Sequence, residues 1–233
     1  MTVHRVVAAH CPPKPWRNGG GVTRDLCAGD AGVPGDPSFH WRLSLADIDR
    51  DGPFSCLPGV DRCLVLLEGR LSLEFPATPG EAGAVAHGPI GLCAGDPPIA
   101  FRGEAAPVAQ IDGACRALNL MTARGRAFGA MRACALADGA GPDAGWVAEI
   151  LAARPGAVPV LHGAYVVAGG LDAAGSVAQA GVLLWSPALG GCSARLPSLR
   201  ALGGVALIEI VVLGAPAERH PKRRGSDDDR LRT

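Results

Sequence analysis

The frequent glycine and proline residues are the feature of this sequence that most restricts its fold. The chain of 233 residues contains 33 glycines and 20 prolines, which divide it into short apolar runs. Helix signals are scarce, whereas short β-prone segments between closely spaced turn residues are typical of a sandwich or barrel. We therefore predict an all-β protein.

The predicted strands form two groups, separated by a Gly/Pro/Ala-rich linker at residues 138–145. The first group is Val22–Cys27, Phe39–Ala46, Cys63–Leu67, Leu71–Phe75, Ile99–Phe101, Val108–Ile111 and Arg116–Met121, and the second is Trp146–Leu151, Ala164–Val167, Val182–Trp185, Ala194–Leu196 and Ala206–Leu213. One helix is predicted over Gly125–Ala137, where a few apolar residues have roughly helical spacing. We expect two units, at residues 1–135 and 146–215, and a disordered, mixed-charge tail at residues 216–233.

Two of the predicted strands differ in their apolar pattern. Residues 41–46 (WRLSLA) alternate, so Trp41, Leu43 and Leu45 share one face while Arg42 and Ser44 lie on the other. Residues 64–67 (LVLL) are apolar on both faces, as in a strand buried on both sides. This contrast predicts a sheet that lines a partly polar interior.

Charge and cysteine usage narrow the class of protein. The 22 basic and 22 acidic residues balance, so a surface for nucleic acid or an anionic membrane is not expected. The apolar run at residues 6–9 is too short for a signal peptide, which predicts a cytoplasmic protein. The eight cysteines are scattered without a Cys-x-x-Cys pair, so we expect buried thiols in place of disulfides or zinc ligands.

A faint internal repeat points to two related β units. Residues 64–71 (LVLLEGRL) are similar to residues 165–171 (YVVAGGL), each being a strand, a glycine turn and the start of a new strand. A second apolar strand follows each copy, near residues 99–101 and 182–185. Duplication of one β unit is consistent with this pattern.

Several blocks of sequence resemble a known family. The strand, Glu-Gly turn and strand of residues 64–73 are similar to the core signature of cupins. Residues 15–24 (PWRNGGGVTR), 41–47 (WRLSLAD) with 51–55 (DGPFS), and 58–62 (PGVDR) resemble the HutD/Ves family more narrowly, and residues 113–126 form a weaker fourth block. The resemblance implies a bicupin, with two double-stranded β-helix (jelly-roll) barrels of the RmlC-like type. It also implies an association with histidine-utilisation genes or stress response, with urocanate or N-formylglutamate as candidate ligands.

Metal-dependent cupins, by contrast, place clustered histidines and a glutamate inside the barrel. This chain has six histidines but no His-x-His pair, and Asp61 and Arg62 stand where the first ligands would lie. Because a guanidinium stays protonated, Arg62 is not a metal ligand. We predict no metal site and no cofactor.

Arg62 is the first candidate for ligand binding. If the resemblance sets the register, Arg62 lies where metal cupins direct an inward carboxylate, and its planar fork of donors suits a carboxylate ligand. Arg42 and Ser44 would complete an anion-binding floor. The alternative for Arg62 is a structural ion pair with Asp61 or Glu68.

The Asn-Gly-Gly-Gly run at residues 18–21 keeps two interpretations. It is either a plain turn or a loop whose backbone N–H groups and Asn18 amide line the mouth of a pocket. Arg24 either contacts ligand or pairs with Asp25 or Asp47. The predicted ligand-binding residues are Arg62, Arg42, Ser44, Asn18, Gly19, Gly20, Arg24 and, from the fourth block, Asn119.

The resulting prediction is a metal-independent cupin that binds a small carboxylate metabolite and regulates histidine utilisation or stress response. A metal-free isomerase or hydrolase acting on a small organic acid is the alternative. Two further classes stay open. One is a metal-dependent oxygenase, which metal analysis would identify. The other is a structural or partner-binding cupin, which ligand screening would separate from a ligand-binding one. A homodimer is the expected assembly, with neither nucleic acid nor membrane as a partner.

Overall fold

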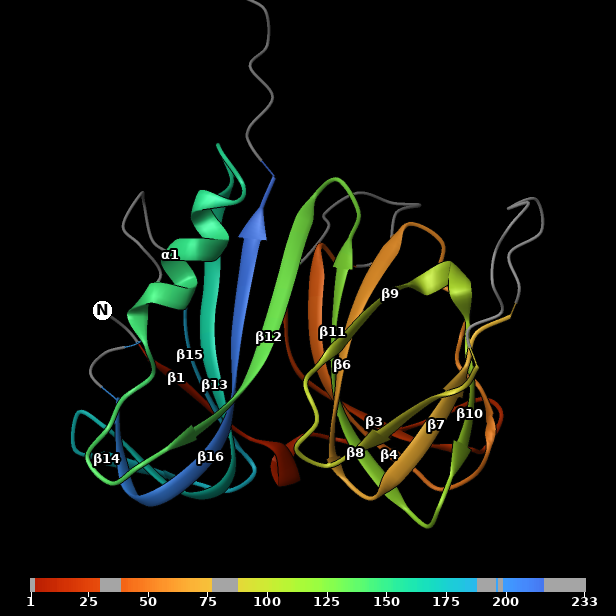
Figure 1. Ribbon diagram of the computed structural model, residues 1–233, viewed down its shortest axis with the longest axis horizontal. Helices are drawn as coiled ribbons and strands as arrows, with labels where there is room; N and C mark the ends of the chain where they lie inside the picture. The colour runs from red at the N-terminus through yellow and green to blue at the C-terminus, as the bar shows by residue number, and fades with distance from the viewer. Residues whose placement is uncertain (1–2, 30–38, 77–87, 188–195, 197–198, 216–233) are drawn as a thin grey trace, which may run out of the picture.

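A computed structural model describes residues 3–29, 39–76, 88–187, 196 and 199–215 of the chain. The elements are β1 (His4–Val7), η1 (Ala8–His10), β2 (Lys14–Pro15), β3 (Gly21–Gly29), β4 (Trp41–Ile48), β5 (Gly52–Pro53), β6 (Val60–Glu68), β7 (Arg70–Glu74), β8 (Ile90–Cys93), β9 (Ile99–Arg102), η2 (Gly103–Ala105), β10 (Val108–Ile111), β11 (Cys115–Ala123), β12 (Ala127–Leu136), α1 (Ala144–Ala152), β13 (Val158–Ala173), β14 (Ser176–Gln179), β15 (Val182–Pro187) and β16 (Leu199–Gly214). The protein is mostly β, as predicted (Figure 1). The predicted tail at residues 216–233 and most of the predicted strand Ala194–Leu196 lie outside the described residues.

The strands form three sheets, which lie in two halves side by side (Figure 1). The central sheet has the order β2-β3-β4-β11-β6-β9, and the four-stranded sheet has the order β5-β10-β7-β8. The C-terminal sheet has the order β1-β15-β13-β16-β12, with β14 paired to β13. Among the described strands none of these sheets closes on itself.

The central sheet is covered on both faces, which explains its apolar strands. One face packs against the C-terminal sheet through Leu43, Val65 and Leu120, which meet Tyr165 and Ile210. The other face packs against the four-stranded sheet in a separate apolar cluster. The prediction that residues 64–67 are buried on both sides is therefore confirmed.

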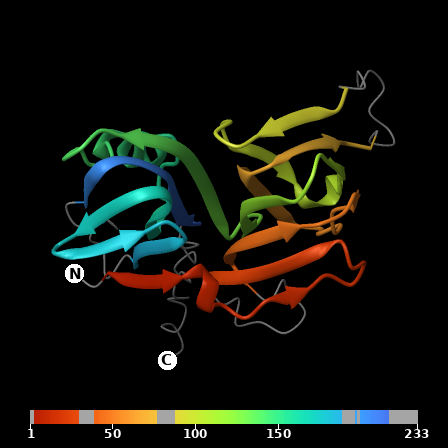
Figure 2. The ribbon, with the colours of Figure 1, turned by 90° about the horizontal axis from the view of Figure 1, so that it is seen from below.

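The chain passes between the halves near its N-terminus. Strand β1 pairs antiparallel with β15, placing His4 opposite Trp185 in the C-terminal sheet. The short η1 helix then leads into β2 and β3 of the central sheet, as Figure 2 shows in red. Strand β12 also pairs with the C-terminal sheet, although it precedes the linker. The division into units 1–135 and 146–215 stays a prediction.

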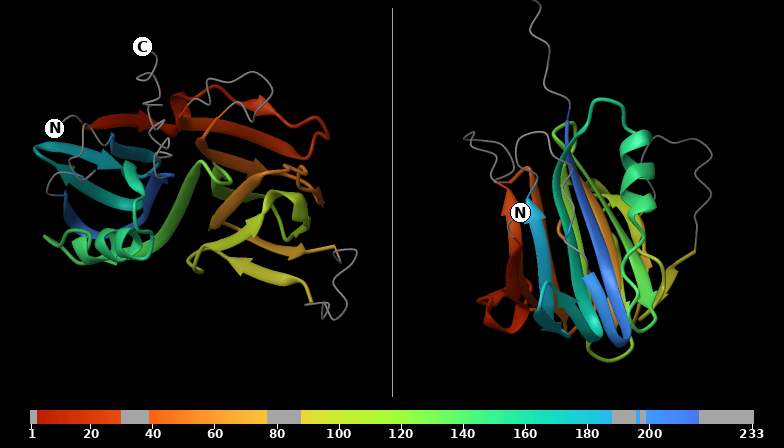
Figure 3. Two further views of the ribbon diagram at one scale, coloured as in Figure 1. Left: turned by 90° about the horizontal axis from the view of Figure 1, so that it is seen from above. Right: turned by 90° about the vertical axis from the view of Figure 1, so that its left-hand side faces the viewer.

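Two predicted elements have the wrong type. The helix predicted over Gly125–Ala137 is strand β12, because pairing with β16 along its whole length overrides a loose helical spacing. The strand predicted over Trp146–Leu151 is helix α1, which begins at an Asp143 cap that accepts a hydrogen bond of 2.8 Å from the Gly145 amide. Its apolar face packs on Val211 and Leu213, so it lies against the C-terminal sheet (Figure 3).

In the described part of the chain, no helix has the length and apolar character needed to cross a membrane.

The three consecutive glycines are constrained by different neighbours. Gly19 has a φ of +67°, in the left-handed region that favours glycine. Gly21 begins β3, where an added Cβ would lie 2.2 Å from the carbonyl oxygen of Asp47 on β4. An added Cβ at Gly20 would meet only the Asn18 side chain, at 3.3 Å. The close approach of two strands therefore requires glycine at position 21.

We predict that Gly21→Ala lowers the free energy of unfolding by about 3 kcal/mol, because the new methyl group overlaps backbone that cannot rotate away. Gly20→Ala is the matched control and is expected to cost less than about 1 kcal/mol, since the Asn18 side chain can shift. Urea denaturation of both variants measures the difference. Equal stabilities would contradict the close strand approach.

Candidate functional site

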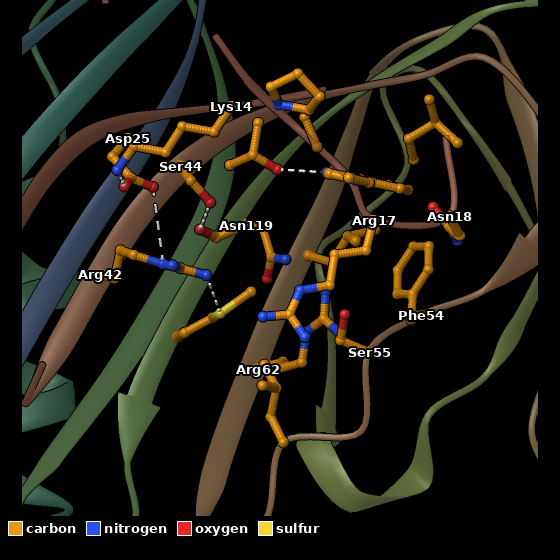
Figure 4. Close-up of a pocket in the computed structure, with 18 of the residues that line it drawn as sticks. Lys14, Arg17, Asn18, Asp25, Arg42, Ser44, Phe54, Ser55, Arg62 and Asn119 are labelled. Atoms are coloured by element: carbon orange, nitrogen blue, oxygen red, sulfur yellow. Dashed lines mark hydrogen bonds and ion pairs between the residues drawn. The ribbon is translucent and has the colours of Figure 1, made fainter. Parts of the chain in front are cut away.

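A pocket of about 520 Å³ opens on the polar face of the central sheet (Figure 4). Its floor comes from β4, β11 and β6, and its walls come from the segment after β2 and the segment after β5. A volume of this size suits a small metabolite. The lining residues used below are Lys14, Trp16, Arg17, Asn18, Thr23, Asp25, Arg42, Ser44, Phe54, Ser55, Arg62, Leu64, Asn119 and Met121.

Strand register arranges the floor in two adjacent rows. Arg62 of β6 pairs with Met121 of β11, which pairs with Arg42 of β4, so two arginines flank a methionine. In the next row Leu64, Asn119, Ser44 and Asp25 follow one another across four strands. We call these the arginine row and the polar row. Since side chains of paired residues share a face, both rows point into the pocket.

The arginine row depends on the alternation seen in the sequence. Arg42 and Ser44 line the pocket, whereas Trp41, Leu43 and Leu45 of the same strand pack in the apolar cluster on the opposite face. The predicted division of this strand into a polar and an apolar face is confirmed.

Arg62 is buried, with no anionic partner in the described part of the chain. Its residue surface is 6% exposed, and among the described residues it makes no hydrogen bond or ion pair. Its guanidinium carbon lies 4.8 Å from the ring centre of Phe54 and 5.1 Å from that of Phe101. Burial, reinforced by the positive charge of Arg42, lowers the pKa of Arg62 to about 10. The site therefore holds a desolvated cation that aromatic rings stabilise only in part.

The alternative ion pairs for Arg62 are not formed. Asp61 pairs with Arg124 at 2.7 Å, and Glu68 pairs with Arg116 at 2.9 Å. Both acidic side chains are thus engaged by other arginines. The alternative interpretation of Arg62 as the partner of Asp61 or Glu68 is wrong.

Arg42 lies at the other end of the arginine row and is less buried. Its Nε lies 3.8 Å from Asp25 Oδ1, its Nη2 donates to the Met121 sulfur at 3.2 Å, and its guanidinium lies 5.0 Å from the ring centre of Phe39. Asp25 also accepts a hydrogen bond of 2.7 Å from Lys14. Because Asp25 is shared between two cations, this end of the pocket also keeps a net positive charge.

The wall of the pocket is aromatic and amphipathic. The Trp16 indole donates to Thr23 at 2.7 Å and meets Phe54 edge-on, with ring centres 6.3 Å apart. Arg17 from the wall and Arg62 from the floor extend into the same part of the pocket (Figure 4). Arg17 is exposed and makes no ion pair among the described residues. Four pocket cations, Lys14, Arg17, Arg42 and Arg62, thus surround one carboxylate, Asp25.

The glycine-run loop contributes less than its sequence suggested. Asn18 lines the pocket, and its Oδ1 accepts a hydrogen bond of 3.0 Å from the Gly20 amide, which is an ordinary turn contact. Gly19 and Gly20 are not among the lining residues. Arg24 is not among them either, because strand alternation turns it away from Thr23 and Asp25.

Arg24 pairs instead with Asp47, one of the two partners considered for it. Arg116 donates to the same carboxylate at 2.7 Å. Partial burial alone would raise the pKa of Asp47, but the hydrogen bonds from Arg116 and Arg24 hold it below its usual range. These two arginines therefore stabilise the strand face outside the pocket.

The sequence predicted five of the pocket residues and missed the others. Arg62, Arg42, Ser44, Asn119 and Asn18 come together as predicted candidates, although a role in binding is still a prediction. The missed residues are Lys14, Trp16, Arg17, Asp25, Phe54 and Met121. Trp16 and Arg17 belong to the Pro-Trp-Arg-Asn block, so that block was a usable signal for the pocket wall.

The described residues contain no group of three or more His, Cys, Asp or Glu side chains able to hold a metal ion. Nor do the buried thiols show activation, because burial raises the pKa of Cys63 to about 11 and that of Cys27 to about 12. The seven cysteines in the described ranges are all free.

A second polar cluster lies in the C-terminal sheet, away from the pocket. Glu209 of β16 is fully buried and pairs with Arg132 at 2.7 Å and with His162 Nε2 at 2.7 Å. The other His162 nitrogen accepts the Leu196 amide at 3.1 Å, and Arg132 donates to the Asp143 carbonyl oxygen at 2.9 Å. Through His162 and Arg132, Glu209 thus connects Leu196 and α1 to the sheet.

The structure is thus that of a mostly-β protein with a basic pocket that has an aromatic wall. Comparison with known proteins shows its family. A family model described as HutD matches residues 8–163, so the chain belongs to the HutD family. Protein Ves of Citrobacter koseri is 48% identical over 58 residues, which is 25% of this chain and 29% of that protein. An uncharacterized 21.2 kDa protein in the hutC 3′ region of Pseudomonas putida is 45% identical over 58 residues, or 25% of this chain and 30% of that protein. The alignments therefore span less than a third of these relatives.

Solved structures agree over nearly the whole chain. HutD from Pseudomonas fluorescens SBW25 superposes with a TM-score of 0.64 at 24% identity, covering 90% of this chain and 98% of that one. The conserved protein PA5104 from Pseudomonas aeruginosa PAO1 gives a TM-score of 0.64 at 21% identity, covering 91% and 99%. At these identities the comparison establishes the fold alone.

Proposed function

We propose that this protein binds a small carboxylate metabolite in the pocket without a metal ion, with Arg62 as the main anchor and Arg42 as the second. The carrying observation is the buried Arg62 guanidinium, which has aromatic neighbours but no anionic partner among the residues that the structure describes. Isolated charges are rarely buried, because removing an ion from water costs several kcal/mol. A bound carboxylate would supply the missing counter-charge and accept two parallel hydrogen bonds from the guanidinium fork.

Regulation or modulation of histidine utilisation is the proposed role of this binding. It is supported by the HutD family match and by the relative in the hutC 3′ region of Pseudomonas putida. The described pocket offers no activated thiol and no histidine, so we favour binding over turnover. Urocanate and N-formylglutamate are the proposed ligands, and the HutD structure from P. fluorescens is described as a formate condition.

We also propose that the two halves are two related cupin-like units. Gly69, after β6, and Gly169, within β13, have φ values of +85° and +81°. An added Cβ at either would lie within 3 Å of a backbone carbonyl oxygen, that of Ala114 or Gly204. These glycines occupy matching places in the sequence repeat, which supports duplication of one strand-corner-strand unit.

A thermal-shift series with urocanate, N-formylglutamate, histidine and formate tests the binding proposal. A ligand that binds only the folded state raises the melting temperature in a concentration-dependent manner. We expect a rise with at least one of the carboxylates at neutral pH. No rise with any of them, at concentrations up to the millimolar range, would reject the pocket as a carboxylate site.

A further inference from the structure

Unpartnered polar atoms concentrate in the pocket. Among the described residues, five buried side-chain nitrogen or oxygen atoms have no hydrogen-bond partner, and four of them belong to residues that line this pocket. Those four are Arg62 Nε, Arg42 Nε, Asn119 Oδ1 and Asp25 Oδ1. A buried polar atom without a partner is costly, so this concentration marks groups organised for a ligand.

The four atoms are of two opposite kinds. The two guanidinium nitrogens, both in the arginine row, can only donate, and the two oxygens, both in the polar row, accept. Asp25 and Arg42 partly satisfy each other at 3.8 Å. Arg62 and Asn119, which are 6% and 5% exposed, have no such contact within the described ranges. A carboxylate supplies acceptors for Arg62 but leaves Asn119 Oδ1 without a donor.

Ser44 extends the accepting character of the polar row. Its hydroxyl donates to the backbone carbonyl oxygen of Asn119 at 3.5 Å, which leaves the lone pairs of its oxygen available. The polar row therefore presents oxygen acceptors from Asn119, Ser44 and Asp25 beside the arginine row. Neighbouring strands lie about 4.8 Å apart, so one small planar molecule can reach both rows.

We infer that the ligand is a carboxylate that also carries a neutral N–H or O–H donor, with its carboxylate on Arg62 and its donor on Asn119 Oδ1. This inference rests on the proposed carboxylate binding and narrows its chemical class. Amido, azole and hydroxy acids meet the requirement, and a bare carboxylate such as formate meets half of it. Asn119 is then the residue that determines specificity, while Arg62 provides most of the affinity.

The test uses two acrylic acids of nearly equal shape, one carrying a pyrrole ring and the other a furan ring. Both have the same carboxylate, joined through the acrylic chain to a planar five-membered ring, but only the pyrrole ring has an N–H donor. Isothermal titration calorimetry on the full chain is expected to give about 10- to 100-fold tighter binding for the pyrrole acid, because the furan acid leaves Asn119 Oδ1 unpaired. Equal affinities, or tighter binding of the furan acid, would overturn the inference while leaving carboxylate binding intact.

Two variants test whether Asn119 causes the difference in affinity between the two acids. Asn119→Leu is expected to bring the ratio of the two affinities to about one, mainly by weakening binding of the pyrrole acid. Thr122→Val is the matched control, because Thr122 is buried on the same strand but does not line the pocket, and it is expected to keep the wild-type ratio. An unchanged ratio in Asn119→Leu overturns the assignment. Absence of binding by both acids and by every carboxylate of the thermal-shift series rejects the proposed function itself.

Discussion

Arg62→Met is expected to weaken carboxylate binding by at least about 100-fold without destabilising the unliganded protein. Charge-assisted, bidentate hydrogen bonds to a buried guanidinium are among the strongest in proteins, and 100-fold corresponds to about 2.7 kcal/mol. Methionine keeps a long, flexible, apolar side chain between Phe54 and Phe101, so the packing is largely retained. Calorimetric titration measures the affinity, and thermal unfolding measures the stability.

The stability half of this prediction follows from the electrostatics of Arg62. Its pKa is lowered to about 10, so the folded protein disfavours the charged form relative to the unfolded chain. This cost applies below about pH 10, where the side chain is charged in both states. Removing the charge forfeits two cation–π contacts but relieves the desolvation cost, and we expect a melting temperature equal to or a few degrees above that of the wild type.

Arg24→Met is the control for Arg62→Met. It makes the same substitution in the same sheet, but Arg24 is paired with Asp47 outside the pocket. Carboxylate affinity should stay within about twofold of the wild type, while stability falls slightly because an ion pair is lost. If Arg62→Met loses several kcal/mol of stability or binds the ligand normally, Arg62 is a structural residue and the proposed anchor is wrong.

Glu209→Ala is expected to produce the largest loss of stability, about 3–5 kcal/mol. The carboxylate is fully buried and pairs with both Arg132 and His162, so truncation leaves their polar atoms without partners. For a chain of this size the change corresponds to a fall of about 6–20 °C in melting temperature. Because the cluster lies outside the pocket, ligand affinity at low temperature should be unchanged.

Glu149→Ala provides the comparison for Glu209→Ala, since Glu149 is exposed on α1. It is expected to change the free energy of unfolding by no more than about 0.5 kcal/mol. A loss of similar small size in Glu209→Ala would mean that the buried cluster does not hold α1 and Leu196 to the sheet.

Strand positions could be predicted where the local apolar pattern of the sequence matches the burial of the strand in the fold. The alternation of residues 41–46 separates two faces in the structure, and the doubly apolar residues 64–67 lie between two layers. Both patterns are local consequences of burial, so they can be read without the fold. Strand β10 has the bounds predicted for it, Val108–Ile111.

Elements whose type depends on distant partners could not be predicted in this way. Strand β12 owes its conformation to pairing with β16, which lies about 80 residues further along the chain. Helix α1 lacks a clear sequence signal because its Asp143 cap lies within the Gly/Pro/Ala-rich stretch at residues 138–145, which is typical of a linker. The pairing of β1 with β15 likewise has no local signal.

The pocket residues also divide into those that a local sequence pattern predicts and those that depend on the tertiary fold. Arg42, Ser44 and Arg62 could be proposed from strand alternation and family register, but Lys14, Asp25 and Phe54 reach the pocket through segments whose approach depends on the whole fold. The pairing of Asn119 with Ser44 and Leu64 required the strand order β4-β11-β6. Sequence patterns therefore gave the candidates, and the sheet topology gave their grouping.

Calorimetric titration of the wild-type chain with a carboxylate and its matching carboxamide tests the central claim most directly. Urocanate is compared with its carboxamide, and N-formylglutamate with its diamide, so that every carboxylate charge is removed while the shape is kept. The account predicts saturable one-to-one binding for at least one acid and an affinity at least about 100-fold lower for its amide. Equal binding of acid and amide, or no binding of either acid, would contradict recognition of a carboxylate by Arg62.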